Sequence, residues 1–177
     1  FDEEGYFRSG DAVKWIDPQN IHKGLKFDGR IAEDFKLTTG TFVSVGPLRA
    51  RVIAAGAPYV QDVVVTGLNR NEVGALIFPT AAIRSLAQLE ASASLADVLG
   101  SPPVQVHFQQ VLNQLAATAT GSATRIARAV LLSEPPSIDK GEVTDKGSIN
   151  QRAVLKHRDQ LVEVLYNGTA DHIIQPQ

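Results

Sequence analysis

Two apolar segments separated by a short polar turn constrain the fold of this chain more than any other feature. The first runs from Tyr59 to Thr66 and contains three consecutive valines, and the second runs from Val73 to Phe78. Residues 69–72, Asn-Arg-Asn-Glu, have the composition of a turn between them. Such short runs, rich in β-branched residues, predict two buried strands that pair back on each other. We therefore expect a compact layer built from strands and helices.

The remaining segments supply helical and extended patterns around this hairpin. Proline in a first turn, a possible Thr80 cap and apolar residues at helical spacing predict the helices. They are expected at 47–56, from Thr80 to about Glu90, at 101–121 and at 152–166. Extended pieces are expected at 35–37, 42–43 and 125–132, with a hairpin over 11–29, a surface linker at 91–96 and a polar hairpin over 137–151. The predicted fold class is α+β, a small domain with a central sheet of about three strands flanked by helices, plus two-stranded hairpins.

Charge and composition exclude several kinds of function. The net charge of −2 argues against general binding of nucleic acid or of an anionic membrane surface. The absence of cysteine excludes disulfides and thiolate metal sites, and the four histidines show no ligand spacing, so we expect no metal site in this chain. No apolar run reaches the ~18 residues that span a bilayer, and no signal peptide opens the chain. A cytoplasmic protein is the default expectation.

The chain contains no methionine and begins at Phe1. We therefore expect it to be part of a longer protein, preceded by a partner domain. The hairpin over 11–29 is too small to bury a core of its own, so we expect it to belong to that partner domain.

Three polar segments could carry chemistry, although each alone has the composition of a solvated turn or loop. Gly10-Asp11 comes first, Asp28-Gly29-Arg30 forms a cationic elbow, and Asp145-Lys146-Gly147 lies in a glycine-rich loop near the other end. Asp-Gly is a common turn pair, so the elbow is weak evidence by itself. Together with the Lys-x-x-x-Gly strand turn from Lys36 to Gly40, the order and spacing of these segments are more specific than any one of them.

This ordered pattern resembles the C-terminal portion of the adenylate-forming enzymes, the family of acyl-CoA synthetases, peptide-synthetase adenylation domains and luciferases. The resemblance covers essentially the whole chain and is densest over 33–49, Glu-Asp-Phe-Lys-Leu-Thr-Thr-Gly-Thr-Phe-Val-Ser-Val-Gly-Pro-Leu-Arg, and over 144–155, Thr-Asp-Lys-Gly-Ser-Ile-Asn-Gln-Arg-Ala-Val-Leu. Both stretches are most similar to feruloyl-CoA synthetases. The resemblance implies that residues 1–28 end a large N-terminal adenylation domain and that 29–177 form a mobile C-terminal lid.

The resemblance also implies roles for individual residues. Asp11 would accept hydrogen bonds from the ribose hydroxyls of the nucleotide, and Arg30 would contact the same nucleotide. Asp28 would be the hinge about which the lid rotates between an adenylate-forming and a thioester-forming arrangement. Gly40 would lie in the loop that lines the CoA tunnel after rotation, where the lack of a Cβ lets backbone approach a ligand closely.

A reactive lysine is implied as well, but its position departs from the family pattern. In most relatives this lysine directly precedes an aliphatic residue, whereas here Ser148 precedes Ile149. Lys146 lies two residues back, which on an extended strand is the same face at about 7 Å. We predict Lys146 as the catalytic lysine, with Lys140 as the alternative.

Other charged residues receive less specific expectations. Leu48-Arg49 stands where many relatives have Ile-Glu, so a role for that glutamate is not carried over. Arg125, Arg128 and Arg152 are expected to be surface or interface groups, with CoA phosphates as their alternative partners.

The function implied is that of an AMP-forming acid–CoA ligase, exercised by the full-length parent and not by this chain alone. The parent would activate a carboxylic acid, ferulate or a related hydroxycinnamate, as acyl-AMP and transfer it to CoA. ATP, Mg²⁺ and CoA would bind largely in the N-terminal domain, while the lid lysine and Mg²⁺ stabilise the charge that builds up on the phosphates. The partners would be that domain and the substrates, with no nucleic acid. The alternatives are a long-chain fatty acyl-CoA ligase and a non-catalytic α/β binding module.

Overall fold

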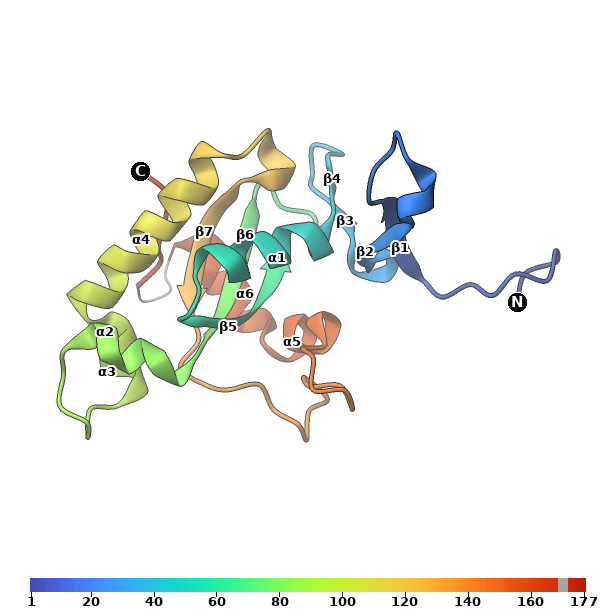
Figure 1. Cartoon of the computed structure of the whole chain (residues 1–177). Helices are drawn as coiled ribbons and strands as arrows, with labels where there is room; N and C mark the ends of the chain where they lie inside the picture. The colour runs from blue at the N-terminus through green and yellow to red at the C-terminus, as the bar shows by residue number, and fades with distance from the viewer. Residues whose placement is uncertain (169–171) are drawn as a thin grey trace.

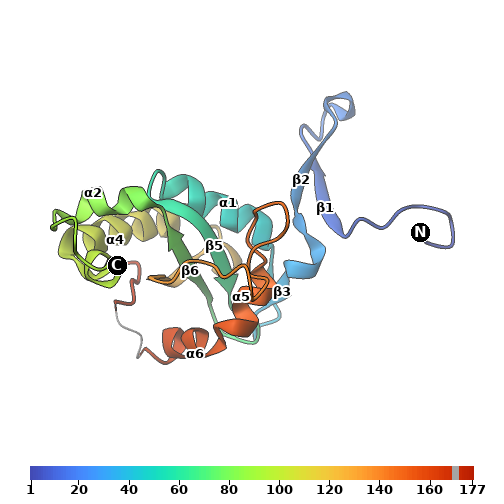
Figure 2. The same ribbon diagram turned by 90° about the horizontal axis from the view of Figure 1, so that it is seen from below.

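The computed structural model describes residues 1–168 and 172–177, and its body is a three-stranded mixed sheet between two layers of helices (Figures 1 and 2). The strands are β5 (Val60–Thr66), β6 (Val73–Pro79) and β7 (Ile126–Leu131). The central strand β6 pairs antiparallel with β5 and parallel with β7. Parallel pairing needs a long crossover, and the helices between β6 and β7 provide it.

Helices cover both faces of the sheet (Figure 2). They are α1 (Val45–Ala55), α2 (Arg84–Ala87), α3 (Leu95–Gly100), α4 (Pro102–Ala117), α5 (Gln151–His157) and α6 (Asp159–Asn167). Val63 and Ile77 pack with residues of α1 and α4 in one core, while Val64, Leu76 and Phe78 pack with residues of α5 and α6 in the other. Because successive side chains of a strand point to opposite faces, a strand covered on both sides is apolar throughout. The predicted buried hairpin and the predicted fold class are confirmed.

Two smaller hairpins precede the sheet. Their strands are β1 (Asp11–Trp15) with β2 (Leu25–Arg30), and β3 (Phe35–Lys36) with β4 (Phe42–Val43), each pair antiparallel. The short 3₁₀ helices are η1 (Ile21–Lys23), η2 (Ile31–Glu33), η3 (Ala81–Ile83) and η4 (Ser122–Thr124). The β1–β2 hairpin projects from the body and meets it through β2 and α1 (Figures 1 and 2).

Several predicted boundaries were wrong. The helix expected from Thr80 to Glu90 is broken into η3 and α2, and Gln88 ends it in a left-handed conformation with φ 54°. The Thr80 hydroxyl donates to the carbonyl of Pro58 and does not cap the helix. The expected linker at 91–96 includes Ser94, whose hydroxyl accepts from the amide of Asp97 and so caps α3. The longest helix, α4, ends at Ala117 instead of near Gly121.

The C-terminal part differs from expectation in two further ways. The expected final helix is divided into α5 and α6 at Arg158, whose backbone leaves the helical conformation while its side chain turns towards Glu142. The polar hairpin expected over 137–151 is reduced to a single bridge between Val143 and Ile149. Among the described residues, no helix is both long and apolar enough to cross a membrane.

Candidate functional site

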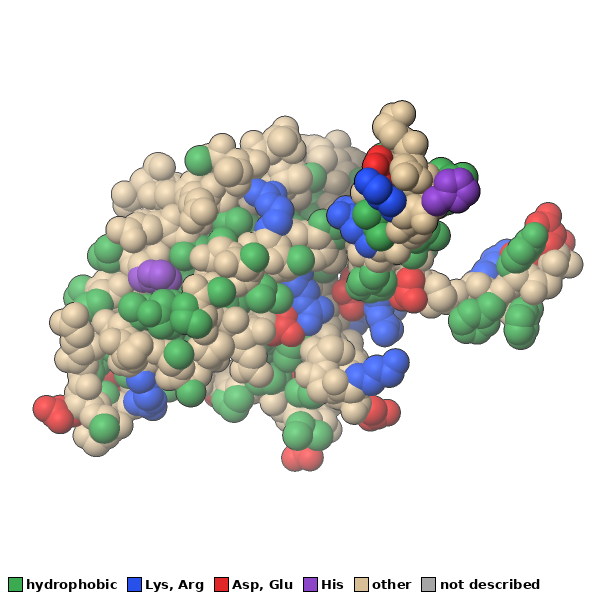
Figure 3. Space-filling view, viewed as in Figure 1, with side chains coloured by type: hydrophobic (Ala, Val, Ile, Leu, Met, Phe, Trp, Pro, Cys, Tyr) green, Lys and Arg blue, Asp and Glu red, His purple; other side chains and the backbone are tan. Residues whose placement is uncertain are grey.

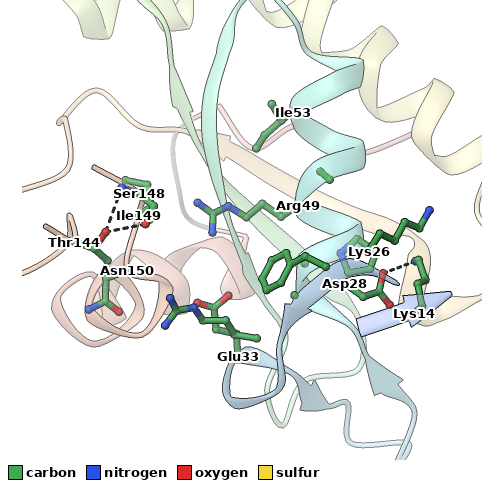
Figure 4. A pocket seen from close by; sticks show the side chains of 16 residues that line it. Lys14, Lys26, Asp28, Glu33, Arg49, Ile53, Thr144, Ser148, Ile149 and Asn150 are labelled. Carbon is green, nitrogen blue, oxygen red and sulfur yellow. Dashed lines mark hydrogen bonds and ion pairs between the residues drawn. The ribbon is translucent and has the colours of Figure 1, made fainter. Parts of the chain in front are cut away.

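A pocket of about 660 Å³ lies where β2, called the hinge strand below because it carries the predicted hinge residue Asp28, meets the first turns of α1 and the loop 144–150 (Figure 4). Its lining comprises Lys14, Lys26, Phe27, Asp28, Gly29, Arg30, Glu33, Gly46, Pro47, Arg49, Ala50, Ile53, Thr144, Ser148, Ile149 and Asn150. The elbow and the glycine-rich loop are more than a hundred residues apart in sequence. The fold nevertheless brings them to opposite walls of one pocket.

The elbow residues form the end of β2, where the predicted nucleotide contacts face each other. Asp11 and Arg30 are directly opposite in the β1–β2 register, and directly opposite residues have Cβ atoms about 5 Å apart. Asp28 makes an ion pair with Lys14 of β1 (Figure 4). Asp28 and Arg30 line the pocket, whereas Asp11 lies behind them on the neighbouring strand.

Two glycines let the elbow cross the first turn of α1. Gly29 has φ +117°, a conformation that side chains disfavour, and it lies against Gly46. A Cβ at Gly46 would stand 2.5 Å from the Cα of Gly29 and 2.9 Å from the carbonyl oxygen of Asp28. Both positions therefore require glycine in this arrangement. Gly46 was not singled out from the sequence. Its position directly before Pro47, at the start of a predicted helix, was the signal that could have drawn attention to it.

The base of the loop 137–150 is fixed by a buried ion pair. Glu142, 1% exposed, accepts from Nε and Nη2 of Arg158 at 3.0 and 2.8 Å, and from the amide of Ser137 at 2.8 Å. The Arg158 guanidinium beside Glu142 is the main cause that holds the pKa of that carboxyl below its usual range. The amide of Asn150 donates to the Glu142 carbonyl at 2.8 Å, which closes the base.

The tip of the same loop presents hydroxyl groups to the pocket, and its lysine points elsewhere. The hydroxyls of Thr144 and Ser148 lie 2.8 Å apart and both residues line the pocket (Figure 4). Gly147 makes the turn between them with φ +79°. Lys146 is exposed and is not among the lining residues, and the same holds for Lys140. Ser148, which stands where the resemblance led us to expect a lysine, lines the pocket.

Positive charge in the pocket gathers around one half-buried carboxylate. Burial raises the pKa of Glu33, and the arginines Arg49, Arg30 and Arg152 oppose that rise. Arg49 lines the pocket and also forms a bidentate pair with Asp62 of β5, at 2.6 and 2.5 Å. Glu33 and Arg49 were not predicted as site residues: Glu33 was given no role of its own, and Arg49 stands where the resemblance would have a glutamate, so no role was carried over to it.

Arg128, Arg152 and Gly40, which were named from the sequence, do not line the pocket. Arg128 makes an ion pair with Glu72 and donates to two carbonyls of α6, so its role is to join β7 to that helix. Arg152 donates to the carbonyl of Ala32, next to the hinge strand. Gly40 occupies the exposed tip of the β3–β4 hairpin with φ +80°, and it does not line the pocket.

The described residues offer no set of donors for a metal ion. Among residues 1–168 and 172–177, no group of three or more His, Cys, Asp or Glu side chains could hold one. The polar side chains that line the pocket include the cations of Lys26 and Arg30, the carboxylates of Asp28 and Glu33, and the hydroxyls of Thr144 and Ser148. Such cations and hydroxyls can hydrogen-bond an anionic or hydroxylated ligand.

Comparison with known proteins adds a family and several relatives. Residues 34–170 match the family described as AMP-binding enzyme C-terminal domain. Two Arabidopsis thaliana proteins are similar over 172 residues, which is 93% of this chain: Probable acyl-activating enzyme 16, chloroplastic, at 23% identity, and Long-chain-fatty-acid--[acyl-carrier-protein] ligase AEE15, chloroplastic, at 24%. The chain spans 23% and 22% of their lengths, less than a quarter of each.

Solved structures share the fold. The adenylation domain of the carboxylate reductase GR01_22995 from Mycobacterium chelonae superposes with a TM-score of 0.66 at 26% identity, covering 94% of this chain and 24% of that one. The A domain of carboxylic acid reductase from Segniliparus rugosus, in complex with AMP and a co-purified carboxylic acid, gives a TM-score of 0.65 at 21% identity, covering 96% and 25%.

Proposed function

We propose, because the chain belongs to the family of AMP-binding enzyme C-terminal domains, that it is the mobile lid of an AMP-forming acyl-activating ligase. The observation that carries the proposal is the pocket in which the elbow residues Asp28 and Arg30 face the loop 144–150. In this reading residues 1–28 end the large adenylation domain and 29–177 form the lid. Rotation about Asp28 would change what the lid presents to the bound nucleotide.

The proposed division of roles follows the chemistry of acyl-adenylate formation. Attack of a carboxylate on the α-phosphorus of ATP increases negative charge on the transferred group and on pyrophosphate. Arg30 and Asp11 would hold the nucleotide by charge and by hydrogen bonds to its ribose, and Lys146 would stabilise the developing charge where water is excluded. Bound Mg²⁺ would supply further charge neutralisation from ligands outside this chain. Gly40 would line the path of the acceptor thiol, proposed to be that of CoA, after rotation.

The acid that is activated is the finer part of the proposal. The stretches 33–49 and 144–155 support ferulate or a related hydroxycinnamate by their similarity to feruloyl-CoA synthetases. None of the relatives named above is a feruloyl-CoA synthetase. A long-chain fatty acid is the second candidate, favoured by the name of one Arabidopsis relative. The cytoplasmic location stays a prediction, since both Arabidopsis relatives are named chloroplastic.

A half-reaction experiment on the full-length parent tests the lysine assignment. Lys146→Ala should slow acyl-adenylate formation, measured by pyrophosphate release, by about 10²–10³-fold, the effect of removing one preorganised donor. Thioester formation from supplied acyl-adenylate should change little. Lys140→Ala is the matched control, and a loss in that variant instead of in Lys146→Ala would move the role to Lys140. Ser148→Ala tests whether the pocket-facing hydroxyl matters instead.

A substrate panel and the chain alone test the rest of the proposal. Pyrophosphate release by the parent with hydroxycinnamates and with long-chain fatty acids decides between the two candidate acids. The isolated chain should form no adenylate. Adenylate formation by this chain on its own would refute the division of labour between lid and large domain. A parent that forms no adenylate with any acid would favour the non-catalytic binding module.

A further inference from the structure

Three consecutive residues at the start of α5 hold the end of the loop 144–150 in place. The Asn150 side chain caps the helix by accepting from the amide of Ala153 at 3.3 Å. The buried side chain of Gln151 accepts from the amide of Val65 at 3.0 Å, on the outer edge of β5. Arg152 reaches in another direction, towards the segment that follows the hinge strand. The end of the loop is therefore attached to the sheet through Gln151 and to the segment after the hinge strand through Arg152.

Arg152 contacts the segment after the hinge strand by donating two hydrogen bonds to one carbonyl oxygen. Its Nε and Nη2 groups donate to the same oxygen, that of Ala32, at 3.1 and 2.6 Å. Ala32 lies in the one-turn helix η2, and short helices leave carbonyls that need partners from outside. Hydrogen bonds from an ionised donor are stronger than neutral ones, so this exposed arginine holds η2 despite its contact with water.

The other end of η2 is fixed to a different element. The carboxylate of Asp34 accepts from the amide of Val45 at 2.8 Å, at the first residue of α1. An aspartate at a helix N-terminus also interacts favourably with the helix dipole. The segment after Arg30 is thus attached to α1 through Asp34 and to α5 through Arg152.

We propose that Arg152 is a positioning residue that makes η2 and the loop 144–150 one rigid unit, so that rotation is confined to Asp28–Arg30. The proposal rests on the proposed function of the chain as a rotating lid. Arg30 stands two residues before Ala32, and Ser148 four residues before Arg152. The clamp therefore fixes the separation between the nucleotide-facing arginine and the loop tip across the pocket. Without it, η2 would keep its attachment to α1 through Asp34 but would lose its direct link to α5 and the loop.

The matched control lies on the same helix. Lys156 is exposed, four residues after Arg152, and does not line the pocket. Residues four apart share one face of a helix, so Lys156→Ala removes a similar charge from that face without touching η2. Arg152→Lys keeps the charge but replaces the planar fork by a single ammonium group, which cannot chelate the carbonyl from two fixed donors.

The two half-reactions of the parent enzyme distinguish positioning from general stabilisation. Arg152→Ala should reduce the rate of acyl-adenylate formation at least tenfold, about 1.4 kcal/mol in activation free energy. The rate of thioester formation from supplied acyl-adenylate should stay within about threefold, since that step uses the rotated lid. Arg152→Lys should recover part of the loss, and Lys156→Ala should match the wild type. An equal loss in both half-reactions, or none in the first, overturns the proposal.

Hydrogen exchange on this chain tests the clamp without any activity. The amide of Asp34 donates to the carbonyl of Ile31 within η2. Its exchange should accelerate at least tenfold in Arg152→Ala, while the amides of α4 keep their wild-type rates. Unchanged exchange at residues 31–34 overturns the clamp. A wild-type parent without adenylation activity refutes the proposed function instead, and the exchange result still decides whether the clamp exists.

Discussion

The chain contains two hairpins of similar length, β5–β6 and β1–β2. The first is largely buried and the second is largely exposed to solvent. Every residue of β6 from Val73 to Phe78 is buried, and its partner β5 is buried from Val63 to Thr66. In the β1–β2 hairpin, by contrast, Trp15 is 46% exposed and Phe27 63%. Both hairpins pair antiparallel, so backbone pairing alone does not distinguish them. The difference lies in what covers their side chains.

This contrast shows that the two hairpins differ in how the rest of the chain covers them. The β5–β6 hairpin is sealed by helices on both faces, whereas the β1–β2 hairpin extends away from that body (Figure 2). Further exposed aromatic residues, Phe1, Tyr6 and Phe7, lie on the N-terminal segment before it, where Figure 3 shows hydrophobic side chains on an extension that stands clear of the rest. An isolated hairpin is marginally stable, and contiguous exposed apolar surface marks an interface. Both features support the proposal that the hairpin belongs with a large adenylation domain.

The largest effect is expected from truncating an aromatic side chain of the sealed hairpin. Phe78 is 1% exposed and its ring lies under the guanidinium of Arg158, 5.1 Å from the centroid. Phe78→Ala should lower the free energy of unfolding of this chain by about 3–5 kcal/mol, because it leaves a cavity and removes the cation–π contact. Urea denaturation followed by circular dichroism measures it. A loss below about 1 kcal/mol would contradict the assignment of Phe78 to a sealed core.

The next effect tests the polar anchor beside that core. Glu142→Gln should cost about 2 kcal/mol at pH 7, less than the ~3–5 kcal/mol of breaking a fully buried pair, because the amide oxygen still accepts hydrogen bonds. The folded-state pKa of Glu142 is lowered from 4.5, so its stabilising contribution is present above pH 4.5 and is lost as the pH falls through the lowered value. Urea denaturation at pH 6, 4.5 and 3 should show the wild-type advantage shrinking. A difference that does not depend on pH would refute the linkage.

A smaller effect is expected where the exposed hairpin meets the body. Gly46→Ala would place a Cβ against the backbone of Gly29, so we expect a loss of about 1–3 kcal/mol from overpacking. Gly121→Ala is the matched control. Gly121 has extended backbone with φ 168° and nothing within 4 Å of an added Cβ, so its effect should stay within about 0.5 kcal/mol. Thermal denaturation of both variants measures the difference. Equal losses of stability in the two variants would mean that the close approach of Gly46 to Gly29 does not restrict this position to glycine.

The smallest effect is expected from the exposed counterpart of Phe78. Phe27→Ala in this chain should change the free energy of unfolding by no more than about 0.5 kcal/mol, since the ring is already in contact with water. In the full-length parent the same variant should cost more than 1 kcal/mol if the large domain covers the hairpin. Urea denaturation of both proteins makes the comparison. A large loss in this chain, or none in the parent, would remove the distinction between the two hairpins.

Much of the fold could be predicted from the sequence because the signals are local. Consecutive β-branched residues predict β5, Ser-Pro-Pro before an apolar stripe predicts α4, and Pro47 marks the start of α1. The errors lie where long-range contacts decide. Thr80 has the chemistry of a cap, but its hydroxyl donates to the carbonyl of Pro58. The final helix breaks at Arg158, the residue whose side chain pairs with Glu142. Neither partner is visible in a local pattern.

The candidate site was predicted in part. Asp28 and Arg30 were singled out with the loop that faces them, and Asp11 proves to be the cross-strand neighbour of Arg30. Lys146 was chosen by the lack of a lysine at 148, yet it does not line the pocket in this arrangement. Its role stays a prediction, as do those of the other site residues. Glu33 and Gly46 were not found from the sequence, and Arg152 was named there without its partner, because the contacts with Arg49, Gly29 and Ala32 that make them notable are brought together only by the fold.

By itself the sequence determined the strands of the buried hairpin, the cores of the longer helices, and which residue types stand in a family-like order. Those properties depend on the periodicity of side chains and on turn chemistry within a few residues. Only the tertiary structure decided that Gly46 meets Gly29, that Arg152 holds Ala32, and that a serine rather than a lysine faces the elbow across the pocket. These contacts join segments far apart along the chain, so they are set by how the body packs around its sheet.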